Sequence, residues 1–148
     1  MIENLKALGS VHIVVKDLNG AVKDERTVDN LVVDTGLAFI ASRMKDATAT
    51  AMTHMAVGTG TTSPTGSDTD LVALAGSREA LDHTTVTGSQ IEYICGFESS
   101  ESTGTITEAG IFNAASGGTM LCRVVFSAIE KGADDSLSIN WKITLSAS

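Results

Sequence analysis

The chain has 148 residues and a formal net charge of −8, with 43% hydrophobic and 19% charged residues. This length suits a single domain spanning residues 1–148, and the composition excludes a disordered chain. The 10 basic residues are scattered, with their longest cluster at residues 43–45, so the clustered phosphate contacts of a nucleic-acid-binding protein are not expected.

The first third of the chain predicts a hairpin. Residues 11–15 (VHIVV) have the composition of a strand, and a second strand returns over residues 21–28. Between them Asn19 and Gly20 predict a tight turn, because both residue types accept positive φ. The residues before the first strand, about 1–10, are expected to form a short N-terminal arm that either docks on a neighbouring molecule or is disordered.

Only one segment predicts an α-helix, near residues 35–46. Apolar residues recur at helical spacing from Leu37 to Met44. Asp34 or Thr35 precedes this run and is of a type that caps helix N-termini. We therefore expect one helix, packed against a structure made mostly of strands.

Strand patterns dominate the remaining sequence. Residues 54–57 predict a short strand that enters a glycine-containing loop over residues 58–66, and residues 71–75 predict a short helical or irregular piece. Further strands are predicted over residues 78–86, 90–98, 105–113, 119–126 and 136–145, with a turn at Gly88 and Ser89 between the first two. Turn signals every 8–12 residues predict a mainly β fold, an antiparallel β-sandwich of jelly-roll-like type.

The last predicted strand has the clearest pattern. Polar residues fill every second position from Ser136 to Thr144. The apolar positions between and after them are Leu137, Ile139, Trp141, Ile143 and Leu145. Because side chains alternate between the two faces of a strand, these five are expected to point into one core.

Cysteine usage and hydropathy limit the possible environments. Cys95 and Cys122 lie far apart within alternating apolar stretches, which predicts two buried thiols and neither a disulfide framework nor a zinc site. The N-terminal segment lacks the apolar region of a secretory signal, and no apolar run approaches the ~20 residues of a membrane span. We therefore expect a soluble protein, made in a cytoplasm and without a membrane partner.

No pattern of catalytic, cofactor-binding or metal-ligating residues stands out, so we expect neither an enzyme nor a cofactor or metal. Residues 58–60 (GTG) resemble a phosphate loop only in part, because Ser63 stands where a dinucleotide fingerprint needs its third glycine. His12, His54 and His83 are not spaced as ligands on one element. The sequence also lacks a Gly-x-Ser-x-Gly nucleophile motif.

Glu108 is the one unusual carboxylate, because it lies inside a predicted strand beside Ala109 and Gly110. A glycine within a strand often marks a bulge or a close approach of another backbone. Two interpretations remain open. Glu108 faces solvent, which we favour because carboxylates are mostly exposed, or it points inward and accepts backbone amides.

Several segments resemble, in order, blocks of small structural proteins of tailed-bacteriophage virions. The resemblance lies in residues 30–44, residues 57–62 (VGTGTT) with Asp70, Leu71 and Arg78, residues 107–113 (TEAGIFN), residues 121–126 (LCRVVF) and residues 138–143 (SINWKI). It therefore extends over most of the chain. The group includes capsid cement or decoration proteins and the collar modules of tail fibres.

This resemblance implies a β-sandwich that serves in assembly, with no catalytic residues to transfer. The chain length favours a capsid cement or decoration protein on the capsid surface of the virion, with the major capsid protein and copies of itself (a dimer or trimer) as partners. A tail-fibre collar or baseplate adaptor protein is the alternative. A carbohydrate-binding module is less favoured, because only 4% of the residues are aromatic.

Overall fold

The structure is a computed structural model that describes residues 5–45 and 50–147. The described part of the chain is mainly β, with one helix, which confirms the predicted fold class at this level. Its elements are β1 (Leu5–Lys16), β2 (Val22–Val32), α1 (Asp34–Ser42), β3 (His54–Gly58), β4 (Glu79–Ala80), β5 (His83–Thr87), β6 (Gln90–Phe97), β7 (Gly104–Phe112), β8 (Met120–Lys131) and β9 (Ser136–Ala147).

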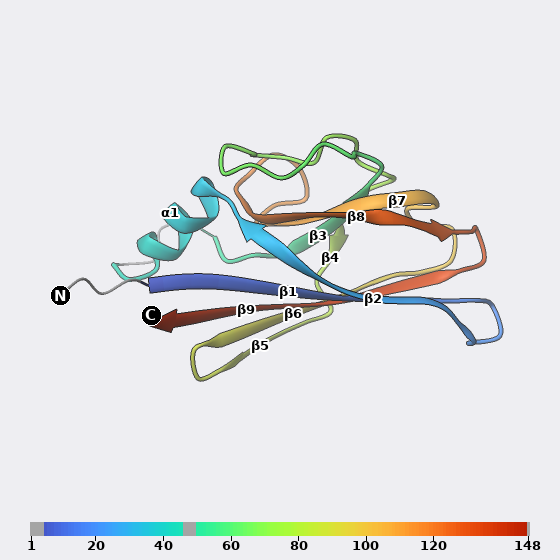
Figure 1. The fold of residues 1–148 in the computed structure, drawn as a ribbon, viewed down its shortest axis with the longest axis horizontal. Coiled ribbons are helices and arrows are strands. Elements are labelled where there is room, and N and C mark those ends of the chain that lie inside the picture. Colours follow the sequence, from blue (N-terminus) through green and yellow to red (C-terminus); the bar gives the residue numbers. More distant parts are fainter. Residues whose placement is uncertain (1–4, 46–49, 148) are drawn as a thin grey trace.

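All nine strands belong to one antiparallel sheet in the order β4-β3-β7-β8-β2-β1-β9-β6-β5. The sheet is curled into a half-barrel, with β1, β9, β6 and β5 on one wall and β3, β7 and β8 on the other (Figure 1). The long strand β2 runs from one wall to the other, since it pairs with β1 over most of its length and with β8 at Leu31 and Val32. The predicted jelly-roll-like sandwich is not confirmed.

The core is organised by three adjacent strands, β1, β9 and β6, of the wall that lies lower in Figure 1, which we call the lower wall. Alternate residues of β9 face alternate residues of both β1 and β6, so their side chains form rows across the sheet. The rows are Val11–Trp141–Tyr93, Ile13–Ile139–Cys95 and Val15–Leu137–Phe97, and all nine residues are buried. The predicted inner face of β9 is confirmed from Leu137 to Ile143, while Leu145 is only partly buried.

The expected N-terminal arm is corrected by the extent of β1. This strand begins at Leu5, which pairs with Ala147, so residues 5–10 are part of the sheet; residues 1–4 lie outside the described residues. Leu5 and Leu8 remain exposed. The apolar residues of this stretch therefore did not reveal the strand. Backbone pairing with β9 holds the stretch in the sheet.

Helix α1 is shorter than predicted and begins differently. It ends at Ser42, and Met44 lies in a turn after it; residue 46 is outside the described residues. The N-cap residue is Val33, without a side-chain cap, so the predicted cap at Asp34 or Thr35 is wrong. Thr35 Oγ1 instead donates to the carbonyl oxygen of Met120 at 2.8 Å, which ties the helix to β8.

The turn signals were reliable, whereas one predicted strand is divided. Gly20 and Gly88 have φ values of 84° and 59°, and each lies in the turn of a hairpin, β1–β2 and β5–β6 respectively. The predicted strand over residues 78–86 is interrupted between β4 and β5. The interruption occurs because β4 pairs with β3 while β5 pairs with β6.

Candidate functional site

Several of the segments that resemble virion proteins lie together on the face of β7 and β8 that points away from the main core, which we call the outer face. The segment of residues 59–78, which we call the covering loop, lies over these two strands (Figure 1, green). As a result β7 is buried on both faces from Ile106 to Phe112. A second apolar cluster forms in this layer from Val33, Ala56, Leu71, Phe112 and Met120.

Glu108 of β7 is at the centre of this layer and is 0% exposed. Its Oε1 accepts the backbone N–H of Val72 at 2.7 Å and that of Ala73 at 3.4 Å, both in the covering loop. The inward-pointing interpretation of Glu108 is therefore confirmed, and the favoured solvent-facing one was wrong. The physical reason is that the covering loop removes this face from water and supplies the amides that the carboxylate needs.

Arg123 of β8 completes the arrangement and is also 0% exposed. Its Nη2 donates to Glu108 Oε2 at 3.4 Å and to the carbonyl oxygen of Thr62 at 2.9 Å, while Nη1 donates to Asp68 Oδ2 at 2.9 Å. Partial burial alone would raise the pKa of Asp68. Hydrogen bonds from Thr65 and the charge of Arg123 outweigh that effect and hold the pKa of this carboxyl below its usual value.

Sequence reasoning did not single out Arg123, although one signal was available. It is the only charged residue in the apolar run of residues 121–126, at a position where both neighbours are buried. A buried arginine needs an anionic or carbonyl partner. That requirement pointed to a carboxylate on an adjacent strand, and Glu108 on β7 is that group.

The glycines of the GTG run permit the close approach of the covering loop. A Cβ at Gly58 would lie 2.3 Å from the carbonyl oxygen of Ala73, and one at Gly60 would lie 1.8 Å from Glu108 Oε2. The carbonyl oxygen of Gly60 also accepts the Oγ1–H of Thr107 at 2.8 Å. The run therefore works as a packing element between the covering loop and β7.

Arg78 anchors the far end of the covering loop. Its guanidinium carbon lies 3.5 Å from the centroid of the Phe112 ring, within the range of a cation–π contact. Nη1 donates to the carbonyl oxygens of Ala114 and Gly117 at 2.9 and 2.8 Å, and Nη2 lies 3.5 Å from Asp70 Oδ1. The structure thus brings together Asp70 and Arg78, two residues of the resemblance.

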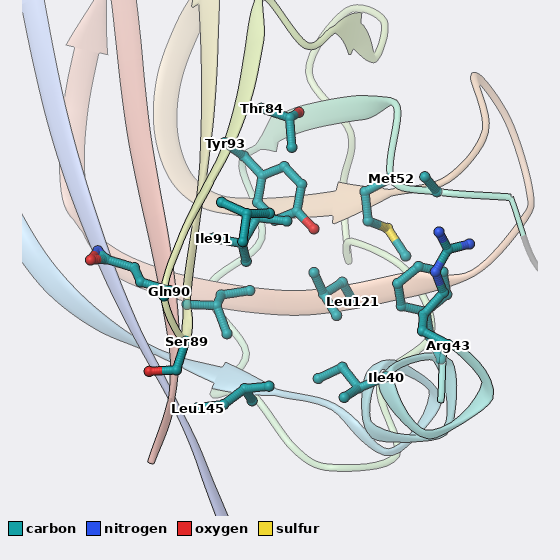
Figure 2. Close-up of a pocket in the computed structure, with 15 residues that line it drawn as sticks. Ile40, Arg43, Met52, Thr84, Ser89, Gln90, Ile91, Tyr93, Leu121 and Leu145 are labelled. Atoms are coloured by element: carbon teal, nitrogen blue, oxygen red, sulfur yellow. The ribbon is translucent and has the colours of Figure 1, made fainter. Parts of the chain in front are cut away.

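A second feature is an apolar groove of about 370 Å³ between α1 and the β5–β6 hairpin (Figure 2). Its lining is mostly aliphatic and includes Ile40, Met52, Leu121 and Ile143. The ring of Tyr93 also borders the groove, and burial raises the pKa of its hydroxyl to about 12. The groove is suited to contacting apolar groups, because it offers few polar atoms to a ligand.

The three histidines are not brought together. His12 Nε2 lies 2.8 Å from Glu25 Oε1, His54 Nδ1 lies 2.8 Å from Thr53 Oγ1, and His83 is exposed on β5. Within residues 5–45 and 50–147, no three His, Cys, Asp or Glu side chains are grouped as metal ligands. None of the described helices has the length and apolar character needed to cross a membrane.

Cys95 and Cys122 are free and buried, as predicted, and we expect them to be unreactive in the folded protein. Burial, followed by the charges of Asp82 and Glu79, raises the pKa of Cys95 to about 12, and burial raises that of Cys122 well above its usual value. A thiol reagent at about pH 8 should therefore label neither cysteine in native protein and both in denaturant. Rapid labelling of one thiol under native conditions would contradict their burial.

No protein-family model, no curated protein and no solved structure matches the chain.

Proposed function

We propose that this protein is a structural component of a tailed-bacteriophage virion, a capsid cement or decoration protein that binds the head shell and stabilises it. The supporting observation is the position of the residues in the resembling segments. Gly60, Asp70, Arg78, Glu108 and Arg123 come from distant parts of the chain and together fix the covering loop. They hold the covering loop against β7 and β8, which gives these strands a built surface layer of the kind that an assembly module needs.

The proposed partners are the major capsid protein and further copies of this chain. The net charge of −8 keeps the protein soluble and complements a basic docking surface on the capsid. In the resembling proteins a β-sandwich makes the contacts of assembly. In this proposal the curled sheet has that role. Binding depends on protein–protein contacts alone and places the protein on the capsid surface.

The test uses capsids of the parent phage that lack this protein. Purified protein should sediment with these capsids to a saturating ratio and raise the temperature at which they release their contents. Because the proposed docking is between an acidic protein and a basic surface, added salt should weaken it. Folded protein that fails to bind at low salt would count against the proposal.

The alternative is a tail-fibre collar or baseplate adaptor, since the same segments occur in both kinds of protein. Electron microscopy of virions that carry a tagged copy separates them. Label on the head supports the decoration protein, and label confined to the tail supports the adaptor. A carbohydrate-binding module remains the third candidate, and a glycan array with specific signals would favour it over both.

A further inference from the structure

The two ends of the sheet differ in how they are protected. One end is β4, which has only two residues and lies close to β6, where Cys95 Sγ is 3.6 Å from the carbonyl oxygen of Ala80. The other end is β5, whose five residues are all exposed. Among the described residues no strand pairs with the outer side of β5 (Figure 1). In an antiparallel ladder, alternate residues of such a strand direct their N–H and C=O groups away from the sheet.

The β5 edge carries none of the usual protections against strand addition. Edge strands are commonly blocked by lysine, proline, an inward charge or a bulge. The sequence of β5 is HTTVT, and its register with β6 is regular over all five pairs. The chain has 18 Asp and Glu residues but none of them in β5, so two copies can approach there with little local repulsion.

A second copy of the same strand fits this edge. In a two-fold symmetric antiparallel pair, one residue must lie opposite its own counterpart, because opposing side chains share a face. With Thr85 at that position, Thr84 faces Val86 of the second copy and all five residues are paired. Three of the pairs then join β-branched side chains, which is a favourable combination on neighbouring strands.

The apolar groove lies beside the same edge. Thr84 and Val86 line it from β5, and Val86 is 69% exposed. Thr85 and Thr87 point to the other face of the sheet, next to Glu92 and Lys142. A second β5 added at this edge would place its own Thr84 and Val86 on the groove side, and so cover apolar surface as it satisfies the backbone.

We infer that the β5 edge is a self-association site, at which two copies pair their β5 strands antiparallel about Thr85 and cover the apolar groove of each. This inference deepens the proposed function, because it assigns a surface to the contact between copies. It concerns the isolated protein, so it is tested without capsids.

The first experiment compares two lysine substitutions at equally exposed apolar residues. Val86→Lys places a charge on the edge, whereas Leu18→Lys, at a residue that is 73% exposed, places one in the distant β1–β2 turn. Sedimentation equilibrium should show a wild-type dimer, an unchanged dimer for Leu18→Lys, and a dissociation constant at least ~10-fold higher for Val86→Lys. A monomeric wild type, or equal effects of the two substitutions, would overturn the inference.

The second experiment tests the register. Opposing residues of an antiparallel pair have Cα atoms about 4.5–5.5 Å apart, which suits a disulfide. Thr85→Cys should therefore form covalent dimers on mild oxidation, while Asn19→Cys, in the exposed β1–β2 turn, should form few. Both native cysteines are buried and do not interfere. Equal cross-linking of the two variants would overturn the inference.

The two proposals fail separately. Protein that dimerises through β5 but binds no capsid refutes only the capsid role. Wild-type protein that is monomeric and still binds capsids refutes only the β5 contact.

Discussion

Arg123→Met is expected to lower the free energy of unfolding by about 3–5 kcal/mol, as is typical when one partner of a buried ion pair is removed. The substitution keeps much of the side-chain volume but leaves the carboxylate of Glu108 buried without its cation. It also removes the hydrogen bonds to Asp68 and to the Thr62 carbonyl. Chemical denaturation measures the loss, and limited proteolysis should show new cleavage within the covering loop.

Two further variants identify the buried charge as the cause. Adding Glu108→Gln to Arg123→Met removes the unpaired charge while an amide oxygen still accepts the N–H of Val72, so the double variant should recover about 1–2 kcal/mol. Lys142→Met breaks the exposed Glu92–Lys142 pair and should cost less than about 1 kcal/mol. A double variant no more stable than Arg123→Met would contradict an electrostatic origin.

Trp141→Ala is expected to cost about 3–5 kcal/mol, because it deletes a large side chain from the core. Trp141 is 0% exposed and lies in the row between Val11 and Tyr93 at the centre of the lower wall. A loss of this size is a large part of the total stability of a domain, which is commonly about 5–15 kcal/mol. Thermal and chemical denaturation would both report it.

Two substitutions serve as controls for the tryptophan. Trp141→Phe should cost clearly less than Trp141→Ala, because a phenyl ring still fills most of the space of the indole. The lost Nε1 has no hydrogen-bond partner among the described residues. Lys142→Ala changes the next residue, whose side chain is half-exposed on the opposite face, and should be nearly neutral. A near-neutral Trp141→Ala would mean that the inner face of β9 has been assigned wrongly.

Features that depend on neighbouring residues in the chain were predicted well. The alternation in β9 identified its buried face, and Gly20 and Gly88 marked two hairpin turns, because strand geometry and positive φ act over a few residues. The burial of Cys95 and Cys122 followed from the same alternation. Local rules worked at these positions because β6, β8 and β9 each direct one side toward the core.

Features that depend on distant segments were missed. The pairing of Leu5 with Ala147 joins the two ends of the described chain, and no local sequence pattern predicts it. Glu108 was expected to face solvent, since nothing near it in the sequence shows that residues 59–78 cover β7. Arg123 was missed for the same reason, because its anionic partners lie 15 and 55 positions away along the chain.

The sequence alone therefore determined that the chain is mainly β, where its tightest turns lie and which side of β9 is apolar, because these properties follow from side-chain alternation and backbone preference. Only the tertiary structure decided that nine strands share one curled sheet, that a loop covers its outer face and that β5 is left at an open edge. These arrangements arise from contacts between residues far apart in sequence. Their free energy depends on burial and on the pairing of polar groups, which local sequence patterns do not specify.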